Sequence, residues 1–439
     1  MKIKTLPSND KTNGWNCILA DRTPHPALNR DTNADWLVIG AGFAGLAAAR
    51  RLAENCPDEK IVLIDAGIVG ENASGRNSGF AIDTPHTAAG GDEKELLNAR
   101  AYMRLSRAGI AYHQEQINKY GFDCDWDVAG KYQTSVTDRG KAEMLDPFAA
   151  TLDRLNEPYE WIDQADLTAR IGTAHFKHAI YTPGCVLLNP AALVRGLVDH
   201  MPGNVLIHEE TPVTSIEYQN GIQATTPGGT VRAPKMILAA NGFSDQFGFM
   251  HRKFVHIGAH ASITRPLSDT EMEAYGVDTP WGVTPINALG SITCRFTNDR
   301  RILIRNQMEI ATSRSTTKAR QEAMTVQHKR LFDEWFPMLP EVEMEHTWTG
   351  FVAVSRNGAP AFGQIASNVW ISACQNAVGV AKGTASGMLA ADLACGRDNP
   401  LIADMQSLGT PSDTPPGWMT EIGARARLKW DVWTQRHEA

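Results

Sequence analysis

Three glycines and one aspartate near the N-terminus have the types and the spacing of a dinucleotide site. Gly40, Gly42 and Gly45 follow the pattern Gly-x-Gly-x-x-Gly, in which missing side chains allow a tight turn and let the backbone approach a pyrophosphate. Asp65 follows twenty residues after Gly45, where a carboxylate can accept hydrogen bonds from ribose hydroxyl groups. Because such a carboxylate disfavours a 2'-phosphate, the motif argues against NADP and leaves NAD and FAD as candidates.

The segments around this motif predict the βαβ unit that must position it. The apolar, β-branched run at 35–40 indicates a buried strand, and the Ala- and Leu-rich segment at 43–55 indicates a helix. A second buried strand is predicted at 60–66, with Asp65 near its end. Strand, turn, helix, strand and acid therefore fall in the order that dinucleotide binding requires.

The loop after the second strand bears on the choice of cofactor. Residues 67–80 read GIVGENASGRNSGF, a Gly/Ser/Asn-rich stretch with one arginine. A nicotinamide dehydrogenase usually continues here into its next helix and strand. Backbone N–H groups of this loop and the side chain of Arg76 could bind a pyrophosphate and a flavin ring. A solvated turn would have the same composition, so the loop alone leaves both interpretations open.

Two neighbouring stretches resemble the N-terminal signature of the D-amino-acid-oxidase-like FAD oxidoreductases, most closely the branch around gamma-glutamylputrescine oxidase. They are VIGAGFAGLAAARRLAE and LIDAGIVGENASGRNSG. Further stretches resemble that branch in the same order, at 181–197, 231–244, 346–363 and 368–396. The resemblance implies FAD as the cofactor. The residues expected to hold it are Gly40, Gly42, Phe43, Ala44, Gly45, Asp65, Ala66, Ala73, Ser74, Gly75, Arg76, Asn77, Ser78, Val213, Ala240, Gly242, Gly379, Val380 and Ala381.

The ordered matches imply an α/β fold in which a Rossmann-like FAD-binding domain is interleaved with an α+β substrate domain built on an antiparallel sheet. The expected ranges are 33–110, 176–255 and 346–400 for the FAD-binding domain, 111–175 and 256–345 for the substrate domain, 1–32 for an N-terminal leader and 401–439 for a C-terminal tail. Independently of the resemblance, β-rich patterns favour the antiparallel sheet at 130–137, 256–266, 290–299 and 300–307. Helical patterns with mixed charge lie at 94–121 and 316–336.

In such an enzyme the flavin carries the redox step, and the protein places a substrate C–H bond over the ring. Arginine or lysine near the flavin would hold any carboxylate of the substrate. Arg305 and Asn306 stand where the family's strand ends in two glycines close to the isoalloxazine ring. They could clamp an anionic or polyhydroxyl substrate. Alternatively, Arg305 could pair with a neighbouring acid.

Lys382 falls at the start of the helix that follows the family's Gly-His-Gly turn. Val378 replaces the histidine of that turn, which removes one usual polar contact. The amine of Lys382 could hold a substrate anion or favour the reduction of oxygen. An exposed helix lysine is the commoner outcome for such a residue.

Three further side chains are candidates for a part in the chemistry. His86 follows the flavin loop, and His260 lies on a strand that resembles the floor of the family's sheet. Either imidazole could take an ammonium proton near neutral pH, although most histidines are structural. Trp348 matches a recurrent tryptophan beside the flavin in the family, and core packing is its alternative role.

Composition excludes several other classes of function. A net charge of −7 with both signs mixed along the chain gives no basic face for nucleic acid and no polybasic membrane patch. Seven scattered cysteines without a C-x-x-C pair argue against disulfides and against a metal site. The segments that tether flavin in related enzymes contain no suitable Cys or His, so non-covalent FAD is expected. The lack of a long apolar run leads us to expect a cytoplasmic protein.

These observations predict an FAD-dependent oxidase of amines or amino acids. The substrate's C–N bond would be oxidised to an imine, and molecular oxygen would accept the electrons to give peroxide. Candidate substrates are a gamma-glutamylputrescine-like amine, a polyamine or an N-substituted amino acid. A dehydrogenase that uses a quinone or an electron-transfer partner, and a non-catalytic FAD-binding protein, are the alternatives. The oligomeric state stays open.

Overall fold

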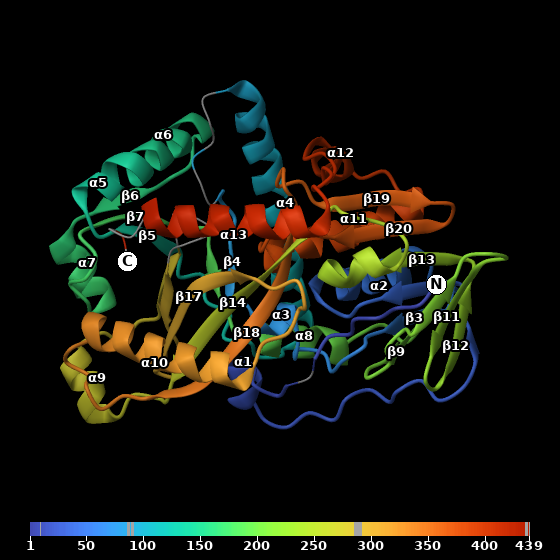
Figure 1. The fold of residues 1–439 in the computed structure, drawn as a ribbon, viewed down its shortest axis with the longest axis horizontal. Helices are drawn as coiled ribbons and strands as arrows, with labels where there is room; N and C mark the ends of the chain where they lie inside the picture. Colours follow the sequence, from blue (N-terminus) through green and yellow to red (C-terminus); the bar gives the residue numbers. More distant parts are fainter. Residues whose placement is uncertain (9, 86–87, 89–91, 285–291, 435–437, 439) are drawn as a thin grey trace.

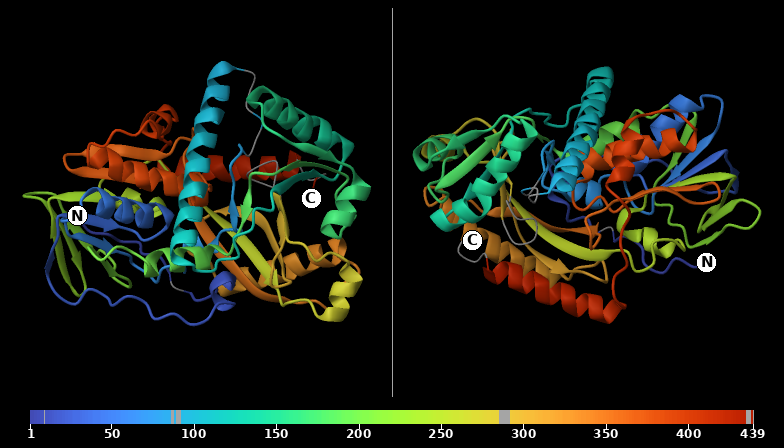
Figure 2. Two further views of the ribbon diagram at one scale, coloured as in Figure 1. Left: turned by 180° about the vertical axis from the view of Figure 1, so that it is seen from behind. Right: turned by 90° about the horizontal axis from the view of Figure 1, so that it is seen from above.

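The computed structural model describes residues 1–439 except 9, 86–87, 89–91, 285–291, 435–437 and 439. Two large sheets dominate the molecule, one of six strands and one of eight. The long helix α4 (Glu93–Tyr120) stands between them (Figures 1 and 2). The α/β fold predicted from the sequence is therefore confirmed.

The six-stranded sheet has the order β19-β20-β13-β2-β3-β9. Five strands run parallel, and β19 pairs with β20 in the antiparallel sense at one edge. The bounds are β2 (Trp36–Ile39), β3 (Ile61–Ile64), β9 (Val205–His208), β13 (Lys235–Leu238), β19 (Ala361–Ala366) and β20 (Val369–Ala373). Every residue of β2 and β3 is buried, as expected of apolar parallel strands covered on both faces.

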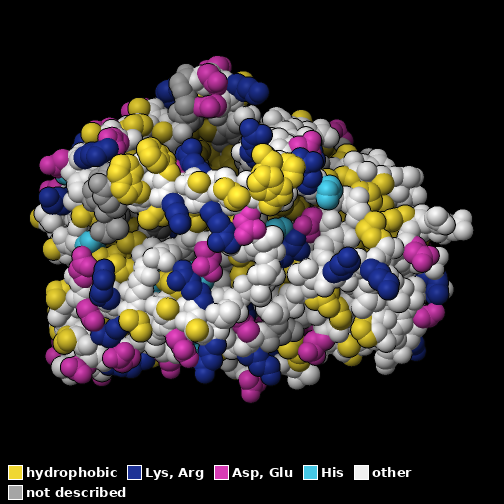
Figure 3. All heavy atoms as spheres, in the orientation of Figure 1, with side chains coloured by type: hydrophobic (Ala, Val, Ile, Leu, Met, Phe, Trp, Pro, Cys, Tyr) yellow, Lys and Arg dark blue, Asp and Glu magenta, His cyan; other side chains and the backbone are white. Residues whose placement is uncertain are grey.

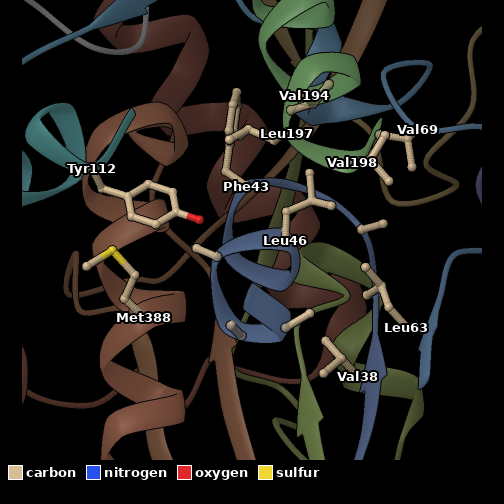
Figure 4. Packing of buried hydrophobic residues seen from close by; sticks show 14 of the residues in the cluster. Val38, Phe43, Leu46, Leu63, Val69, Tyr112, Val194, Leu197, Val198 and Met388 are labelled. Atoms are coloured by element: carbon tan, nitrogen blue, oxygen red, sulfur yellow. The ribbon is translucent and has the colours of Figure 1, made fainter. Parts of the chain in front are cut away.

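Helices cover one face of this sheet. Helix α2 (Phe43–Asn55) follows β2 directly, and its side chains Phe43 and Leu46 share a buried cluster with Val38 of β2 and Leu63 of β3. Helices α8 (Pro190–Asp199) and α11 (Thr384–Ala394) complete that cluster, as Figure 4 shows. The βαβ unit predicted at 35–66 is thus present, and tertiary packing holds its helix from three sides.

A small four-stranded sheet covers the opposite face. Its order is β1-β12-β11-β10, with bounds β1 (Thr32–Asn33), β10 (Ser215–Glu217), β11 (Ile222–Thr226) and β12 (Gly229–Ala233). Leu37 and Ile39 of β2 pack here with Ile216 and Val231. The alternate side chains of β2 therefore enter two different cores, one on each face of the sheet.

The eight-stranded sheet has the order β18-β14-β17-β16-β15-β5-β7-β6. All neighbours are antiparallel except β15 and β5. The bounds are β5 (Lys131–Ser135), β6 (Glu160–Ile162), β7 (His178–Thr182), β14 (Val255–Thr264), β15 (Trp281–Thr284), β16 (Thr293–Phe296), β17 (Ile302–Ile310) and β18 (Met344–Val354). The four β-rich patterns read from the sequence all lie in this sheet. The domain ranges stay a prediction, and β7 and most of β18 fall inside ranges expected for the FAD-binding domain.

The remaining elements are short or peripheral. The helices are α1 (Gly14–Cys17), α3 (Ala73–Arg76), α5 (Asp138–Gly140), α6 (Asp146–Leu155), α7 (Gln164–Ile171), α9 (Asp269–Tyr275), α10 (Lys318–Trp335), α12 (Leu401–Ser407) and α13 (Gly417–Thr434). The π- and 3₁₀-helical turns are η1 (Lys141–Leu145), η2 (Asn241–Gln246) and η3 (Gly379–Gly383), and β4 (Phe80–Ala81) pairs with β8 (Val186–Leu187). The helices predicted at 94–121 and 316–336 correspond to α4 and α10.

A β-bulge interrupts the pairing of β14 with β17. Ala259 pairs with Met308, and the next residue, His260, pairs with Asn306. Gln307 is the extra residue and has a φ of +56°. Because strand residues alternate between faces, the extra residue brings Arg305 and Met308 to the same face of the sheet.

Three further observations concern the described residues. None of their helices carries an apolar stretch long enough to cross a bilayer. No three His, Cys, Asp or Glu side chains among them gather as a metal site would require. All seven cysteines are free thiols.

Candidate active site

One cavity of about 370 Å³ lies between the six-stranded sheet and the eight-stranded sheet. Gly40, Asp65 and Arg76 line the cavity on the side of the six-stranded sheet. Thr293 and Arg305 line it from the eight-stranded sheet. All residues predicted to hold the cofactor line this cavity except Gly45 and Gly75. Residues separated by more than 300 positions in the sequence therefore meet around one space.

The glycine turn between β2 and α2 is built without room for side chains. Gly40 has a φ of +104°, which favours glycine. A Cβ atom at Gly45 would lie 1.7 Å from the carbonyl oxygen of Gly40, so Gly45 serves the packing of α2 on the strand. Gly42 caps α2, and no side chain caps the helix there. The first N–H groups of α2 are therefore left for a ligand, and the positive end of the helix dipole favours an anion such as a pyrophosphate.

Asp65 is fixed at the edge of the cavity by two backbone amides. Its Oδ2 accepts from the N–H of Ala41 at 2.7 Å, and its Oδ1 accepts from the N–H of Gly67 at 2.8 Å. Burial raises the pKa of Asp65, and these two hydrogen bonds oppose that effect. Each carboxylate oxygen keeps a free lone pair, so the group could still accept from ribose hydroxyls.

Protein groups hold the Arg76 loop in place. The guanidinium of Arg76 donates to the carbonyl oxygens of Glu71 at 2.5 Å and Thr349 at 2.9 Å, and it forms an ion pair with Asp10. Trp348 is fully buried, and its Nε1 donates to the carbonyl oxygen of Arg76 at 3.0 Å. Trp348 does not line the cavity, so its observed contact positions the loop.

Residues paired across adjacent strands of the eight-stranded sheet form part of the cavity wall. Ala261 on β14 pairs with Arg305 on β17, which pairs with Thr293 on β16, and all three line the cavity. Thr284 on β15 also lines it, and its buried hydroxyl has no hydrogen-bond partner among the described residues. Arg305 donates to Oγ1 of Thr293 at 2.7 Å, and burial lowers the pKa of its guanidinium to about 10. No ion pair joins Arg305 to an acid in the part of the chain that the structure describes. The alternative considered from the sequence, a pairing of Arg305 with a neighbouring acid, is therefore not seen there.

His260 and Asn306 lie on the other side of the same sheet. The buried ring of His260 makes a 2.9 Å hydrogen bond through Nδ1 with Thr349, and its Nε2 lies 3.3 Å from Glu309. Burial lowers the pKa of His260, and the charge of Glu309 opposes that shift. The Asn306 side chain accepts from the N–H of Gln307 inside the bulge. Neither residue lines the cavity, so their predicted contact with substrate does not fit this geometry, because strand alternation turns both away.

Lys382 is buried, contrary to the exposed helix lysine that is the commoner outcome. It lies in the π-helical turn η3, with its Nζ 5.5 Å from the centre of the Tyr102 ring. Burial lowers the pKa of Lys382 to about 8. Its neighbours Ala381 and Gly383 line the cavity, whereas Lys382 does not. His86, the remaining predicted candidate, lies outside the described residues.

The sequence did not point to two further polar residues of the cavity. Arg314 donates to Oδ2 of Asp245 at 2.5 Å and to Nε2 of His256 at 2.8 Å, and both Arg314 and His256 line the cavity. Nε2 of His256 also lies 3.3 Å from Oδ2 of Asp245, so the three side chains form one polar cluster. Nδ1 of His256 lies beside Gly242, where an added Cβ would approach it to 3.3 Å. No motif marks these residues, because they meet only through the packing of η2, β14 and the segment after β17.

The fold and this cavity define a dinucleotide-binding protein whose cofactor cleft is completed by a second sheet. A family model described as FAD dependent oxidoreductase (DAO) matches residues 35–393, so the chain belongs to this family. The residues present fit FAD, because the uncapped turn at Gly42 suits a pyrophosphate and Asp65 retains acceptors for a ribose.

Relatives over most of the chain have related descriptions. A protein of Haemophilus influenzae described as probable oxidoreductase OrdL is 25% identical over 397 residues, which cover 88% of each chain. Gamma-glutamylputrescine oxidoreductase of Escherichia coli is 24% identical over 375 residues, covering 84% of this chain and 85% of the relative. Glycine oxidase from Geobacillus kaustophilus has a similar fold, with a TM-score of 0.72, 17% identity and coverage of 88% of this chain and 100% of that one.

Proposed function

We propose that this protein oxidises the C–N bond of an amine or amino acid that carries a carboxylate. The product is an imine, molecular oxygen accepts the electrons, and peroxide is released. Membership of the FAD-dependent family supports the reaction class, and the descriptions of its relatives support an amine or amino acid as the substrate. When bound, the flavin supplies the acceptor for a hydride from the carbon next to the nitrogen. A cytoplasmic location stays a prediction from the sequence.

The observation that carries the substrate assignment is the half-buried guanidinium of Arg305. It lines the cavity, donates to Thr293 and has no ionic partner among the described residues. A partly desolvated charge without a counter-ion is unfavourable, and a carboxylate on the substrate would supply that counter-ion through a charge-assisted hydrogen bond. Asp65 is the sole acid among the described residues that line the cavity, and it lies at the glycine turn.

This charge distribution favours two of the three expected substrate classes. A gamma-glutamylated amine and an N-substituted amino acid each carry a carboxylate for Arg305. A free polyamine carries several positive charges and would meet the positive charge of Arg305 in the same cavity. The positive field of Arg305 also lowers the pKa of an adjacent substrate ammonium, which promotes the neutral amine that can be oxidised.

The cofactor is proposed to be held without a covalent bond. No cysteine belongs to the cavity lining within the described ranges. Cys374 is buried beside the cavity, with its Sγ 3.7 Å from the carbonyl oxygen of Ala353. Acid precipitation should therefore release a yellow supernatant, whereas a yellow pellet would contradict this part of the proposal.

Anaerobic reduction of the bound flavin tests the proposed reaction. The purified protein is mixed without oxygen with N-methylglycine, a gamma-glutamylated diamine or 1,4-diaminobutane, and flavin bleaching is recorded. We expect bleaching with at least one of the first two amines and none with the free diamine. Air should then restore the colour with formation of one peroxide per flavin. Bleaching that only a quinone or dye reverses would identify a dehydrogenase, and a flavin that no member of the panel bleaches would contradict the proposal.

A further inference from the structure

Helix α13 exposes its apolar side chains and buries a charged one. Asp431 is its one buried residue, whereas Trp418, Ile422 and Trp430 are 68%, 61% and 60% exposed. An amphipathic surface helix normally shows the reverse pattern, because packing of its apolar face supplies most of its stability. Figure 3 shows hydrophobic side chains on the front of the molecule, in the region where Figure 1 places α13.

Contacts at both ends hold α13 against the body of the molecule. Before the helix, the N–H of Thr414 donates to the carbonyl oxygen of Arg252 at 2.7 Å, and the Arg252 guanidinium donates back to the carbonyl oxygen of Thr414. After it, the carboxylate of Glu438 accepts from the N–H groups of Val136 at 2.7 Å and Thr137 at 3.2 Å. The helix crosses in front of β17 (Figure 1). Its outward face is therefore a fixed part of the surface.

The exposed residues form a stripe that is nearly symmetric about Ala426. At about 100° per residue, the stripe comprises Trp418, Met419, Ile422, Gly423, Ala426, Lys429, Trp430 and Trp433. Ile422 and Trp430 lie four residues before and after Ala426, and Met419 and Trp433 lie seven residues before and after it. The small residues Gly423 and Ala426 occupy the middle. Lys429, three residues after Ala426, mirrors Gly423, three residues before it.

A stripe with this symmetry is complementary to an antiparallel copy of itself. A two-fold axis through Ala426 would place Ile422 against Trp430 of the partner subunit, and Met419 against Trp433 of the partner subunit. Lys429 would lie against Gly423 of the partner subunit, which has no side chain to hinder it. Two-fold homodimers are the commonest assemblies, and an isologous interface requires this kind of self-complementarity.

The charges beside the stripe also favour a second copy. Arg425 forms an ion pair with Glu421 at 2.6 Å on one flank, and Arg427 forms one with Asp431 at 2.9 Å on the other. Such paired charges suit the polar rim of a protein interface. An anionic membrane surface would instead select a helix with a large excess of lysine and arginine, whereas basic residues outnumber acids in α13 by only three to two.

We propose that α13 joins two copies of this chain in an antiparallel pair centred on Ala426. Light scattering after size exclusion should give about twice the chain mass of 48.0 kDa. The substitutions Ile422→Glu and Trp430→Glu each place a charge in the contact and should weaken the dimer at least about tenfold. Val432→Glu is the matched control, because Val432 is an exposed apolar residue of the same helix outside the stripe. This variant should remain dimeric.

Cysteine cross-linking tests the geometry of the pair. Ala426→Cys would face its own copy across the axis and should give a cross-linked dimer on mild oxidation, whereas Val432→Cys should not. Flavin content and circular dichroism establish that each variant is folded. A monomeric parent protein, a dimer that both Ile422→Glu and Trp430→Glu leave intact, or monomers that use the stripe only to bind phosphatidylglycerol vesicles would each overturn the proposal. None of these readouts depends on catalysis, so the result is independent of the proposed function.

Discussion

Arg305 and Thr293 face each other across two antiparallel strands, and the guanidinium donates to the threonine hydroxyl at 2.7 Å. The observed partner of the Arg305 guanidinium is therefore a neutral oxygen and not an acid. Burial lowers the pKa of this guanidinium to about 10. The pair therefore leaves a positive charge unbalanced inside the cavity. An anionic ligand would bind more tightly than a neutral one of the same shape.

Replacing Arg305 should separate substrate binding from flavin binding. Arg305→Met removes the charge and keeps much of the volume, so kcat/KM for a carboxylated amine should fall about ten- to a hundredfold, as for the loss of one charged hydrogen bond. Arg305→Lys should retain more activity than Arg305→Met. Steady-state peroxide release measures both. Equal activity of Arg305→Met and the parent protein would exclude the proposed contact.

Two glycines of the cofactor turn should differ sharply in their tolerance of alanine. At Gly45 an added Cβ would lie 1.7 Å from the Gly40 carbonyl oxygen, whereas at Gly42 it would lie 3.3 Å from the Ser74 hydroxyl. Gly45→Ala should therefore displace α2 and abolish flavin uptake. Gly42→Ala should lower the affinity for FAD by a smaller factor. The ratio of flavin to protein absorbance after dialysis tests this order, and similar ratios for the two variants would contradict it.

His113 should make the protein less stable in acid. Its Nε2 contacts the Val380 carbonyl oxygen at 2.9 Å, and its buried Nδ1 has no partner among the described residues. Burial lowers the pKa of His113 to about 4, below the ordinary 6.5. Between these values the unfolded chain binds more protons, so the free energy of unfolding falls as the pH drops from 6.5 to 4, by up to about 3 kcal/mol.

Substitution of His113 should remove its contribution to the fall in the free energy of unfolding at low pH. His113→Gln keeps a donor for the carbonyl oxygen and cannot be protonated in this range. Urea unfolding at pH 7, 6 and 5 should give a flatter pH dependence for this variant. His328, whose pKa burial also lowers to about 4, should account for another share, and His328→Gln serves as the comparison. Parallel curves for the parent and His113→Gln would show that His113 is not responsible.

The buried amine of Lys382 should cost stability at neutral pH. Burial lowers its pKa to about 8 from 10.5, so below pH 8 the fold holds a charge that water would solvate better. Lys382→Met should raise the free energy of unfolding at pH 7 by about 1–3 kcal/mol. Parent stability should rise between pH 8 and 10.5, where the unfolded chain binds more protons, and the variant should lack that rise. Thermal unfolding from pH 7 to 9.5 measures both effects.

The parts of the fold that depend on local sequence were predictable. The strand–turn–helix at 35–55 is encoded by an apolar run, three glycines and an Ala- and Leu-rich segment that favours a helix. Its position and its glycine contacts therefore follow from neighbouring residues. Asp65 follows from the same unit. The four β-rich segments of the large sheet were likewise visible in their own composition.

Features that depend on register were not predictable from the sequence. The resemblance places the strand of His260 at the floor of the family's sheet, and only the pairing with β17 shows which face the His260 side chain occupies. The bulge at Gln307 places Arg305 and Met308 on one face although they are three residues apart. Arg314 and His256 meet across separate elements, and no local pattern marks that encounter.

The strand order of the six-stranded sheet has a consequence for synthesis on the ribosome. Its central strand β2 is made early, but the neighbour β13 ends at Leu238, and β20, which pairs with β13, ends at Ala373. An emerging chain therefore holds exposed apolar strands until most of its length has been translated. Long-range pairing of this kind slows folding and leaves intermediates open to aggregation. Production at lower temperature with added riboflavin should consequently raise the yield of intact protein more than a stronger promoter.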